Sequence, residues 1–110
     1  MAKAIKDSGH EVASPWNLDP NEVSSPSVAN VFERDRVGSE SADVMVADAT
    51  DPSTGVGMEV MAAYKAGRRI IIVSKKNKKI SKMLEDMNRK ERIEYNAEAE
   101  IYQKLLGLLR

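Results

Sequence analysis

Cysteine is absent from this chain of 110 residues, so neither disulfide bonds nor thiolate chemistry contributes to its stability or activity. Long hydrophobic runs are absent as well, and no segment approaches the ~18 apolar residues that would suggest a membrane span. The segment 1–9 contains no apolar stretch of the kind found in secretory signals. We therefore expect a cytoplasmic protein that has no membrane as partner.

An excess of charge of either sign is also absent, because 17 Lys and Arg residues balance 17 Asp and Glu residues. Binding to a nucleic acid backbone depends on positive charge, so the composition gives no reason to expect a nucleic acid partner. Four lysines do cluster at 75–79, and we interpret them as a solvent-exposed loop. The length and the 42% of hydrophobic residues indicate one globular domain, 1–110, with a single core.

Short apolar runs predict two buried strands, at 43–49 and 69–74. The second is apolar at four consecutive positions, Ile70 to Val73, which is typical of a strand covered on both faces in a parallel sheet. Helical spacing and turn residues predict helices at 2–8, 27–41, 56–66, 78–88 and 97–109, weaker strands at 10–14 and 93–95, and a proline-containing loop at 15–26. This order predicts an α/β domain with a mainly parallel sheet, in which the first two strands are adjacent.

A turn of small residues follows the first of these strands, with the sequence ADATDPSTGVGME at 47–59. Ligands of parallel sheets bind beyond the carboxyl ends of the strands, and the N-terminus of a helix attracts anions. Gly55 and Gly57 allow close approach of a ligand to the backbone, and Ser53 can add a hydroxyl. The turn therefore predicts an anion site, although many turns of this composition bind nothing, and no P-loop lysine follows.

Two carboxylates fall on helix faces where apolar residues are expected. Glu59 shares the face of Val60 and Ala63, and Asp35 continues a stripe that includes Phe32. Simpler interpretations exist, because Glu59 can reach water from the start of its helix and Asp35 can pair with an arginine one turn away. A carboxylate pair is also what cleavage of a glycosidic bond needs. For that chemistry we expect the helix dipole to keep Glu59 ionised.

Several segments resemble the nucleoside 2-deoxyribosyltransferase family, over a region from about Gly9 to Met83. They are most similar to its 2′-deoxynucleoside 5′-phosphate N-hydrolase branch. The matching segments are ERD at 33–35, SADVMVAD at 41–48, DPSTGVGME at 51–59 and GRRI at 67–70. The resemblance implies a flavodoxin-like (Rossmann-like) three-layer fold and a homodimer, and we expect neither a metal nor a cofactor.

The resemblance also implies roles for the two carboxylates and the turn. Glu59 matches the family's nucleophile, which forms a covalent deoxyribosyl intermediate. Asp35 matches the residue that helps to transfer a proton to the leaving base. Ser53 and Gly55 match phosphate-binding positions of the hydrolase branch, and Gly57 lies in the same substrate-binding turn.

Three further residues have weaker counterparts in the family. Ser81 and Met83 resemble residues that reach into the partner subunit's site. Trp16 falls near a position that lines the base pocket, although a structural tryptophan is the simpler interpretation. We expect all three to belong to the substrate-binding region.

One feature of the family has no counterpart in the sequence. Family members begin with a strand and a turn similar to Tyr/Phe-x-x-Gly-Ser-Ile-Arg-Gly, whereas this chain begins within the helix that should follow, so we expect the first strand of the family to be missing. The sequence predicts hydrolysis of the N-glycosidic bond of deoxynucleoside 5′-monophosphates, or deoxyribosyl transfer between bases. The alternatives are a non-catalytic nucleotide-binding or regulatory relative and a purely structural dimer unit.

Overall fold

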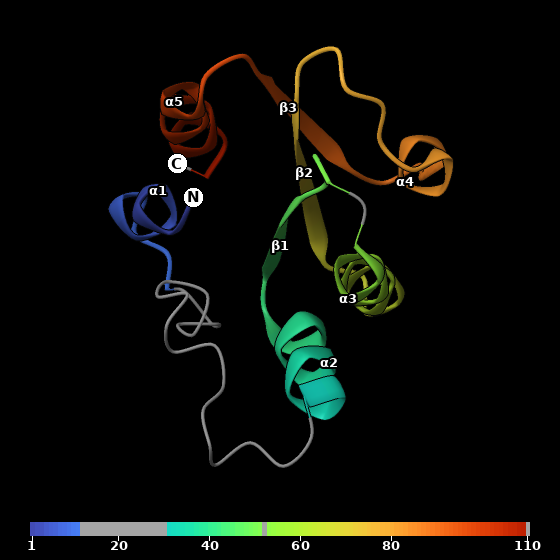
Figure 1. The fold of residues 1–110 in the computed structure, drawn as a ribbon. Helices are drawn as coiled ribbons and strands as arrows, with labels where there is room; N and C mark the ends of the chain where they lie inside the picture. The colour runs from blue at the N-terminus through green and yellow to red at the C-terminus, as the bar shows by residue number, and fades with distance from the viewer. Residues whose placement is uncertain (12–30, 52, 110) are drawn as a thin grey trace.

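A sheet of three parallel strands lies at the centre of the computed structural model, which describes residues 1–11, 31–51 and 53–109. The strands follow one another across the sheet in chain order (Figure 1): β1 (Val44–Asp48), β2 (Arg69–Lys75) and β3 (Glu91–Tyr95). In the register, Val46 is the partner of Ile71, and Ile71 is in turn the partner of Glu91. The predicted parallel pairing of 43–48 with 69–74 is confirmed.

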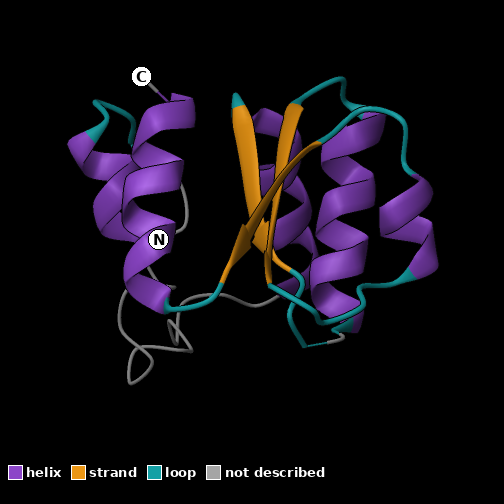
Figure 2. Ribbon diagram, turned by 90° about the horizontal axis from the view of Figure 1, so that it is seen from above, coloured by secondary structure: helices purple, strands orange, loops and turns teal. Residues whose placement is uncertain are grey.

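Helices cover both faces of this sheet: α1 (Ala2–Asp7), α2 (Val31–Ser41), α3 (Thr54–Lys65), α4 (Lys82–Asp86) and α5 (Glu98–Leu109). Figure 2 shows α1 and α5 on one side of the strands and the other helices on the opposite side. The predicted three-layer α/β fold is confirmed by this arrangement. None of the described helices is long and apolar enough to cross a membrane.

The burial of β2 explains why both layers are needed. Its residues from Ile70 to Ser74 are all buried. Ile71 packs in a cluster with Leu105 of α5, whereas Ile70 packs in a second cluster with Val60 of α3. Each buried side chain of this size stabilises the fold by ~1.5–3 kcal/mol. The apolar run that predicted this strand therefore supplies the core of both layers.

Two helix boundaries differ from the prediction. Helix α3 begins at Thr54 instead of residue 56, because the Ser53 hydroxyl accepts the N–H of Val56 at 3.3 Å and caps the helix. Helix α4 covers only Lys82–Asp86 instead of 78–88. Before it, Asn77 has a left-handed backbone with φ of 68°, which a helix does not accommodate. After it, the chain becomes extended at Met87.

Strand β3 and the segment before α2 also have predicted counterparts. Strand β3 has five residues, beginning at Glu91, rather than the three predicted at 93–95. His10 and Glu11 are not in a strand, and the rest of the candidate strand 10–14 lies outside the described residues. The same holds for the predicted loop at 15–26 and for the predicted first turn of the helix that begins at 27.

Candidate functional site

An open groove of about 1580 Å³ runs along α3, with α2 forming one wall and the region of α4 the other. All the site residues predicted from the sequence line it, except Trp16, which lies outside the described residues: Asp35, Ser53, Gly55, Gly57, Glu59, Ser81 and Met83. These residues come from three segments that the fold brings together. The groove therefore unites both predicted carboxylates with the predicted anion-binding turn.

The turn between β1 and α3 forms one end of the groove. Ser53 uses its hydroxyl to accept the N–H of Val56, and its carbonyl accepts the N–H of Gly57 at 3.1 Å. The first N–H groups of a helix have no carbonyl partner within it, so those of Thr54 and Gly55 are available to an anion. The Ser53 hydroxyl keeps its own proton for a ligand as well. The geometry suits a phosphate group.

The two glycines of the turn leave space in front of this helix end. A Cβ atom at Gly55 would meet only the Ser53 Oγ, at 3.9 Å, and one at Gly57 would meet nothing within 4 Å. Neither glycine has a positive φ, so neither is required by the backbone conformation. Their small size instead keeps the surface of the groove open beside the helix N-terminus.

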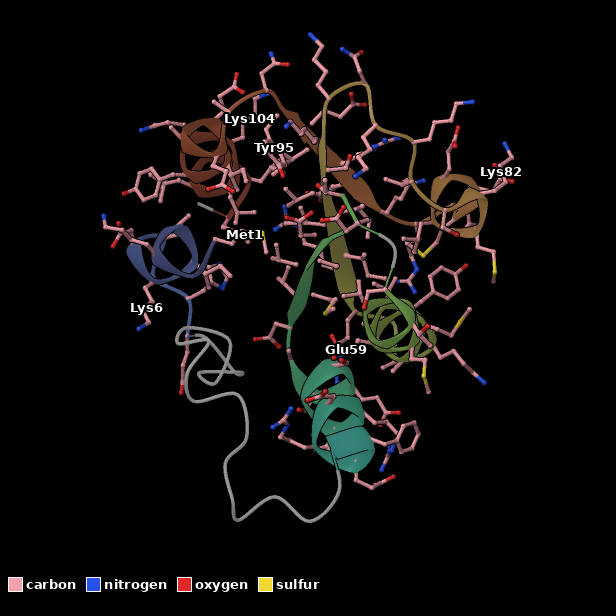
Figure 3. All side chains as sticks on the ribbon, viewed as in Figure 1. Met1, Lys6, Glu59, Lys82, Tyr95 and Lys104 are labelled. Carbon is pink, nitrogen blue, oxygen red and sulfur yellow. The ribbon has the colours of Figure 1, made fainter. Side chains whose placement is uncertain are left out.

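Glu59 and Asp35 meet at the interface of α3 with α2, where Figure 3 labels Glu59. The carboxyl group of Asp35 lies close enough to Glu59 to affect its ionisation. Partial burial raises the pKa of Glu59 above its ordinary value of 4.5, and the charge of Asp35 and the hydrogen bond to it raise it further. The positive charge of Arg34 acts in the opposite direction. Glu59 therefore holds its proton more tightly than an exposed glutamate.

The pKa of Glu59 is thus raised, whereas the helix dipole was expected to favour its ionised form. Glu59 is the sixth residue of α3, which begins at Thr54, whereas the dipole acts within the first turn. Burial beside a second carboxylate therefore has a larger effect on the pKa of Glu59 than the helix dipole.

Arg34 completes the cluster. Its Nε lies 2.9 Å from Oδ1 of Asp35, and the two side chains are only 16% and 24% exposed. The signal that could have revealed this contact is an arginine directly before an inward-facing aspartate. Asp35 thus pairs with an arginine, but with the adjacent Arg34 rather than with one a turn away, and this pairing exists together with the contact to Glu59.

Phe32, which also lies on α2, differs in position from the prediction. It was expected on the inward face beside Asp35, but its side chain is 53% exposed and lines the groove. Helix α2 packs mainly on α3 rather than on the sheet, so its inward face is narrow. Asp35 and the buried Ser39, one turn apart, occupy that face. Phe32 lies at its margin, where the groove leaves it uncovered.

The lysine cluster lies at the carboxyl end of β2, close to the β1–α3 turn. The side chains of residues 75–79 are exposed, as predicted for a solvated loop. Lys78 forms an ion pair of 2.9 Å with Asp51 in the β1–α3 turn, and Lys79 lines the groove. No group of three or more His, Cys, Asp or Glu residues that could hold a metal ion occurs among the residues the structure describes.

Comparison with known proteins identifies the class to which this site belongs. A CMP N-glycosidase from Clostridium botulinum has the same fold, with a TM-score of 0.69 and 22% identity, over 94% of this chain and 83% of that chain. A protein of Methanococcoides burtonii, provisionally named 2′-deoxynucleoside 5′-phosphate N-hydrolase 1, is 31% identical over 88 residues. The match covers 76% of this chain and 71% of the relative. No protein-family model matches the chain.

The parallel α/β fold and the named relatives, an N-hydrolase and an N-glycosidase, define a class of enzymes that act on N-glycosidic bonds. The chain belongs to the nucleoside 2-deoxyribosyltransferase-like family. The family resemblance found in the sequence is thereby confirmed. The roles of individual residues and the substrate of this chain are separate questions, which we address next.

Proposed function

We propose that this protein hydrolyses the N-glycosidic bond of deoxynucleoside 5′-monophosphates, with Glu59 as the nucleophile. The observation that carries the proposal is the contact of Glu59 with Asp35 in the groove into which the Ser53–Gly57 turn also opens. This arrangement offers a carboxylate for the sugar and N–H groups for a phosphate in one cavity. The name of the Methanococcoides burtonii relative supports the same class of substrate.

The proximity of the two carboxyl groups suits the proton transfers of this reaction. Glu59 attacks C1′ of the sugar as the bond from C1′ to the base nitrogen breaks, and the electron pair of that bond leaves with the base. Glu59 must lose its proton to attack, and Asp35 is placed to receive it and to pass it to the departing base. Water then attacks C1′, which releases Glu59 and returns one proton to the carboxyl pair. The products are the free base and deoxyribose 5-phosphate.

The turn and the outer wall of the groove supply binding. The phosphate rests on Ser53, on the N–H groups of Thr54 and Gly55, and beside Gly57. Ser81 lies on the wall opposite α2 and can contact the substrate from that side. A nucleotide-processing role also fits the cytoplasmic location predicted from the sequence. Transfer of the deoxyribosyl group to another base uses the same steps, with the second base in place of water.

We also infer that the protein is a homodimer in which a second copy covers part of the groove. Phe32, Met58, Met61 and Met83 are 53%, 52%, 47% and 75% exposed, and all four line the groove. Clusters of large apolar side chains on a surface mark binding sites. Sedimentation at tens of micromolar protein should therefore give twice the mass of one chain, and a monomer under these conditions would contradict the inference.

The decisive experiment compares Glu59→Gln with the wild type in an assay of base release, separated by chromatography. We expect a loss on the order of 10⁴–10⁶-fold in kcat, the range found when one member of a catalytic group is removed. The matched control is Glu98→Gln, because Glu98 is exposed on α5, outside the groove. It should retain wild-type activity.

The same assay separates the alternatives. Activity that survives Glu59→Gln would overturn the nucleophile assignment. Added free base that becomes incorporated into a new nucleotide would identify a transferase rather than a hydrolase. Tight nucleotide binding by the wild type without any base release would contradict the proposal and favour the non-catalytic relative.

A further inference from the structure

Where the chain leaves strand β1, a side chain replaces the backbone as the hydrogen-bond partner of β2. The last backbone hydrogen bond from β1 to β2 runs from the N–H of Ala49 to the carbonyl of Val73, at 2.8 Å. One residue later, Oγ1 of Thr50 accepts the N–H of Lys75 at 3.0 Å. The threonine hydroxyl thus replaces a backbone carbonyl, which lets the chain turn away from β2 without leaving the N–H of Lys75 unpaired.

The same hydroxyl reaches the third strand. Oγ1 of Thr50 lies 3.2 Å from the hydroxyl of Tyr95, the last residue of β3, whose side chain is 6% exposed. The N–H of Thr50 also donates to Oδ1 of Asp48 at 2.9 Å, which bends the chain at the end of β1. Thr50 is therefore hydrogen-bonded to all three strands at the carboxyl edge of the sheet.

We propose that Thr50 is a positioning residue, which through Lys75 and Tyr95 fixes the β1–α3 turn and with it the phosphate-binding N-terminus of α3. Thr50 precedes Ser53 by only three residues, so we expect a displacement of Thr50 to displace Ser53, the N-cap of α3, as well. The phosphate part of this inference rests on the proposed function. The positioning part rests only on the hydrogen bonds of Thr50.

The placement of Glu59 separates the effect of Thr50 on binding from an effect on chemistry. Glu59 is followed by Val60, which is 1% exposed and packs against the sheet together with Ala63. The second turn of α3 is therefore held by buried core residues. Its first turn contacts the core only through the partly buried Val56, while Thr54 and Gly55 are exposed and follow directly on the loop. Loss of the Thr50 hydroxyl should weaken the grip on the phosphate and leave the attack by Glu59 nearly unchanged.

The test uses Thr50→Val, which keeps the shape and removes the hydroxyl, and Thr50→Ser, which keeps the hydroxyl. For a deoxynucleoside 5′-monophosphate, we expect Thr50→Val to raise KM roughly fivefold to tenfold, the value of one or two hydrogen bonds, while kcat changes less than about twofold. The kcat/KM for the deoxynucleoside without phosphate should not change. Thr50→Ser should restore most of the wild-type KM, and Tyr95→Phe should give an intermediate increase.

Hydrogen exchange tests the positioning role of Thr50 in the absence of substrate. The N–H groups of Val56 and Gly57 are bonded to Ser53, so they should exchange faster in Thr50→Val than in the wild type and in Thr50→Ser. Unchanged exchange at these two positions, or equal losses of kcat/KM for substrates with and without phosphate, would overturn the inference. If the wild type neither cleaves nor binds nucleotides, the proposed function fails, and faster exchange in Thr50→Val alone still supports the positioning role.

Discussion

The two faces of the sheet are built differently. On the side of α1 and α5, Ile71, Val73 and Ile93 pack against Ile101 and Leu105, and all of these side chains are buried. On the side of α2, α3 and α4, buried residues lie next to the sheet, but the outer surface carries large exposed apolar groups and a half-buried carboxyl pair. One face stabilises the fold, and the other keeps an opening that a ligand or a second copy can fill.

Ionisable groups are also distributed unequally between the two faces of the sheet. The buried cluster on the α5 side contains no ionisable group except the Tyr95 hydroxyl, which is hydrogen-bonded to Thr50. On the groove side, Arg34, Asp35 and Glu59 are all partly withdrawn from water. Withdrawal of such groups from water reduces stability unless they are paired, and they occur most often where a function needs them. The comparison therefore predicts that stability and activity respond to mutations on opposite faces.

The largest difference in stability should come from removing core volume on the closed face. Leu105 is fully buried, so Leu105→Ala should lower the free energy of unfolding by ~2–5 kcal/mol, through lost burial and the cavity left behind. Met61→Ala, on the groove side, should lower it by less than ~1 kcal/mol, because Met61 is already largely exposed. Chemical denaturation of both variants at concentrations where the wild type is monomeric measures the two values. Equal losses would remove the distinction between the faces.

A smaller effect, with a defined dependence on pH, is expected at Glu59. Its pKa is higher in the folded chain than its ordinary value of 4.5. Below that value the group is protonated in both states and the folded chain incurs no penalty. As the pH rises from about 4.5 through the raised pKa, the unfolded chain releases its proton first, so the free energy of unfolding falls. Glu59→Gln should abolish this loss, so its stability relative to the wild type should increase with pH.

Denaturation of both proteins at a series of pH values tests this expectation. Other carboxyl groups titrate in the same range, among them Glu33 and Glu100, whose pKa values are lowered by hydrogen bonds to Arg36 and to the N–H groups of Ala97 and Asn96. Their contribution is common to both proteins and cancels in the difference. A difference that stays constant, or shrinks with rising pH, would show that Glu59 is not destabilised in the folded chain.

The smallest effect on the stability of one chain should occur at Met83. Its side chain is the most exposed of the large apolar groups, so Met83→Ser should leave the thermal unfolding of the monomer nearly unchanged. Its contribution should appear in association, as a weaker dimer in sedimentation at decreasing protein concentration. Val37→Ser is the control, because Val37 is also exposed on α2 but does not line the groove. Equal weakening by both substitutions would place the interface elsewhere.

Much of the closed framework was predictable from the sequence, because it follows from local apolar patterns. The run from Ile70 to Val73 identified β2 and its burial on both faces, and the spacing of Ile101 and Leu105 identified α5. The turn at Ser53 and the inward position of Glu59 were also evident from spacing along one helix. In each case the signal lies within a few residues of the feature that it predicts.

Features that depend on contacts between elements were not predictable in this way. Phe32 had the right spacing to face inward, but helix α2 packs on α3 and leaves it uncovered. The pKa of Glu59 is raised by burial and by Asp35 on another helix, and the local dipole argument considered neither. The role of Thr50 depends on Lys75 and Tyr95, which lie 25 and 45 residues away along the chain. Helix α4 was predicted too long because the sequence alone does not reveal the left-handed backbone of Asn77 before it or the extended backbone of Met87 after it.

The contiguity of the site has a consequence for protein engineering. Arg34, Asp35, the turn at Ser53 and Glu59 all belong to one stretch of chain, the unit α2–β1–α3. A chimera that exchanges this stretch between relatives would transplant the proposed chemical apparatus intact onto a different β2–α5 scaffold. The junction that such a graft must preserve is the contact of Thr50 with the N–H of residue 75 and the hydroxyl of Tyr95. Recombination within this family can therefore exchange chemistry and framework as separate modules, provided that the scaffold keeps a tyrosine at the end of β3.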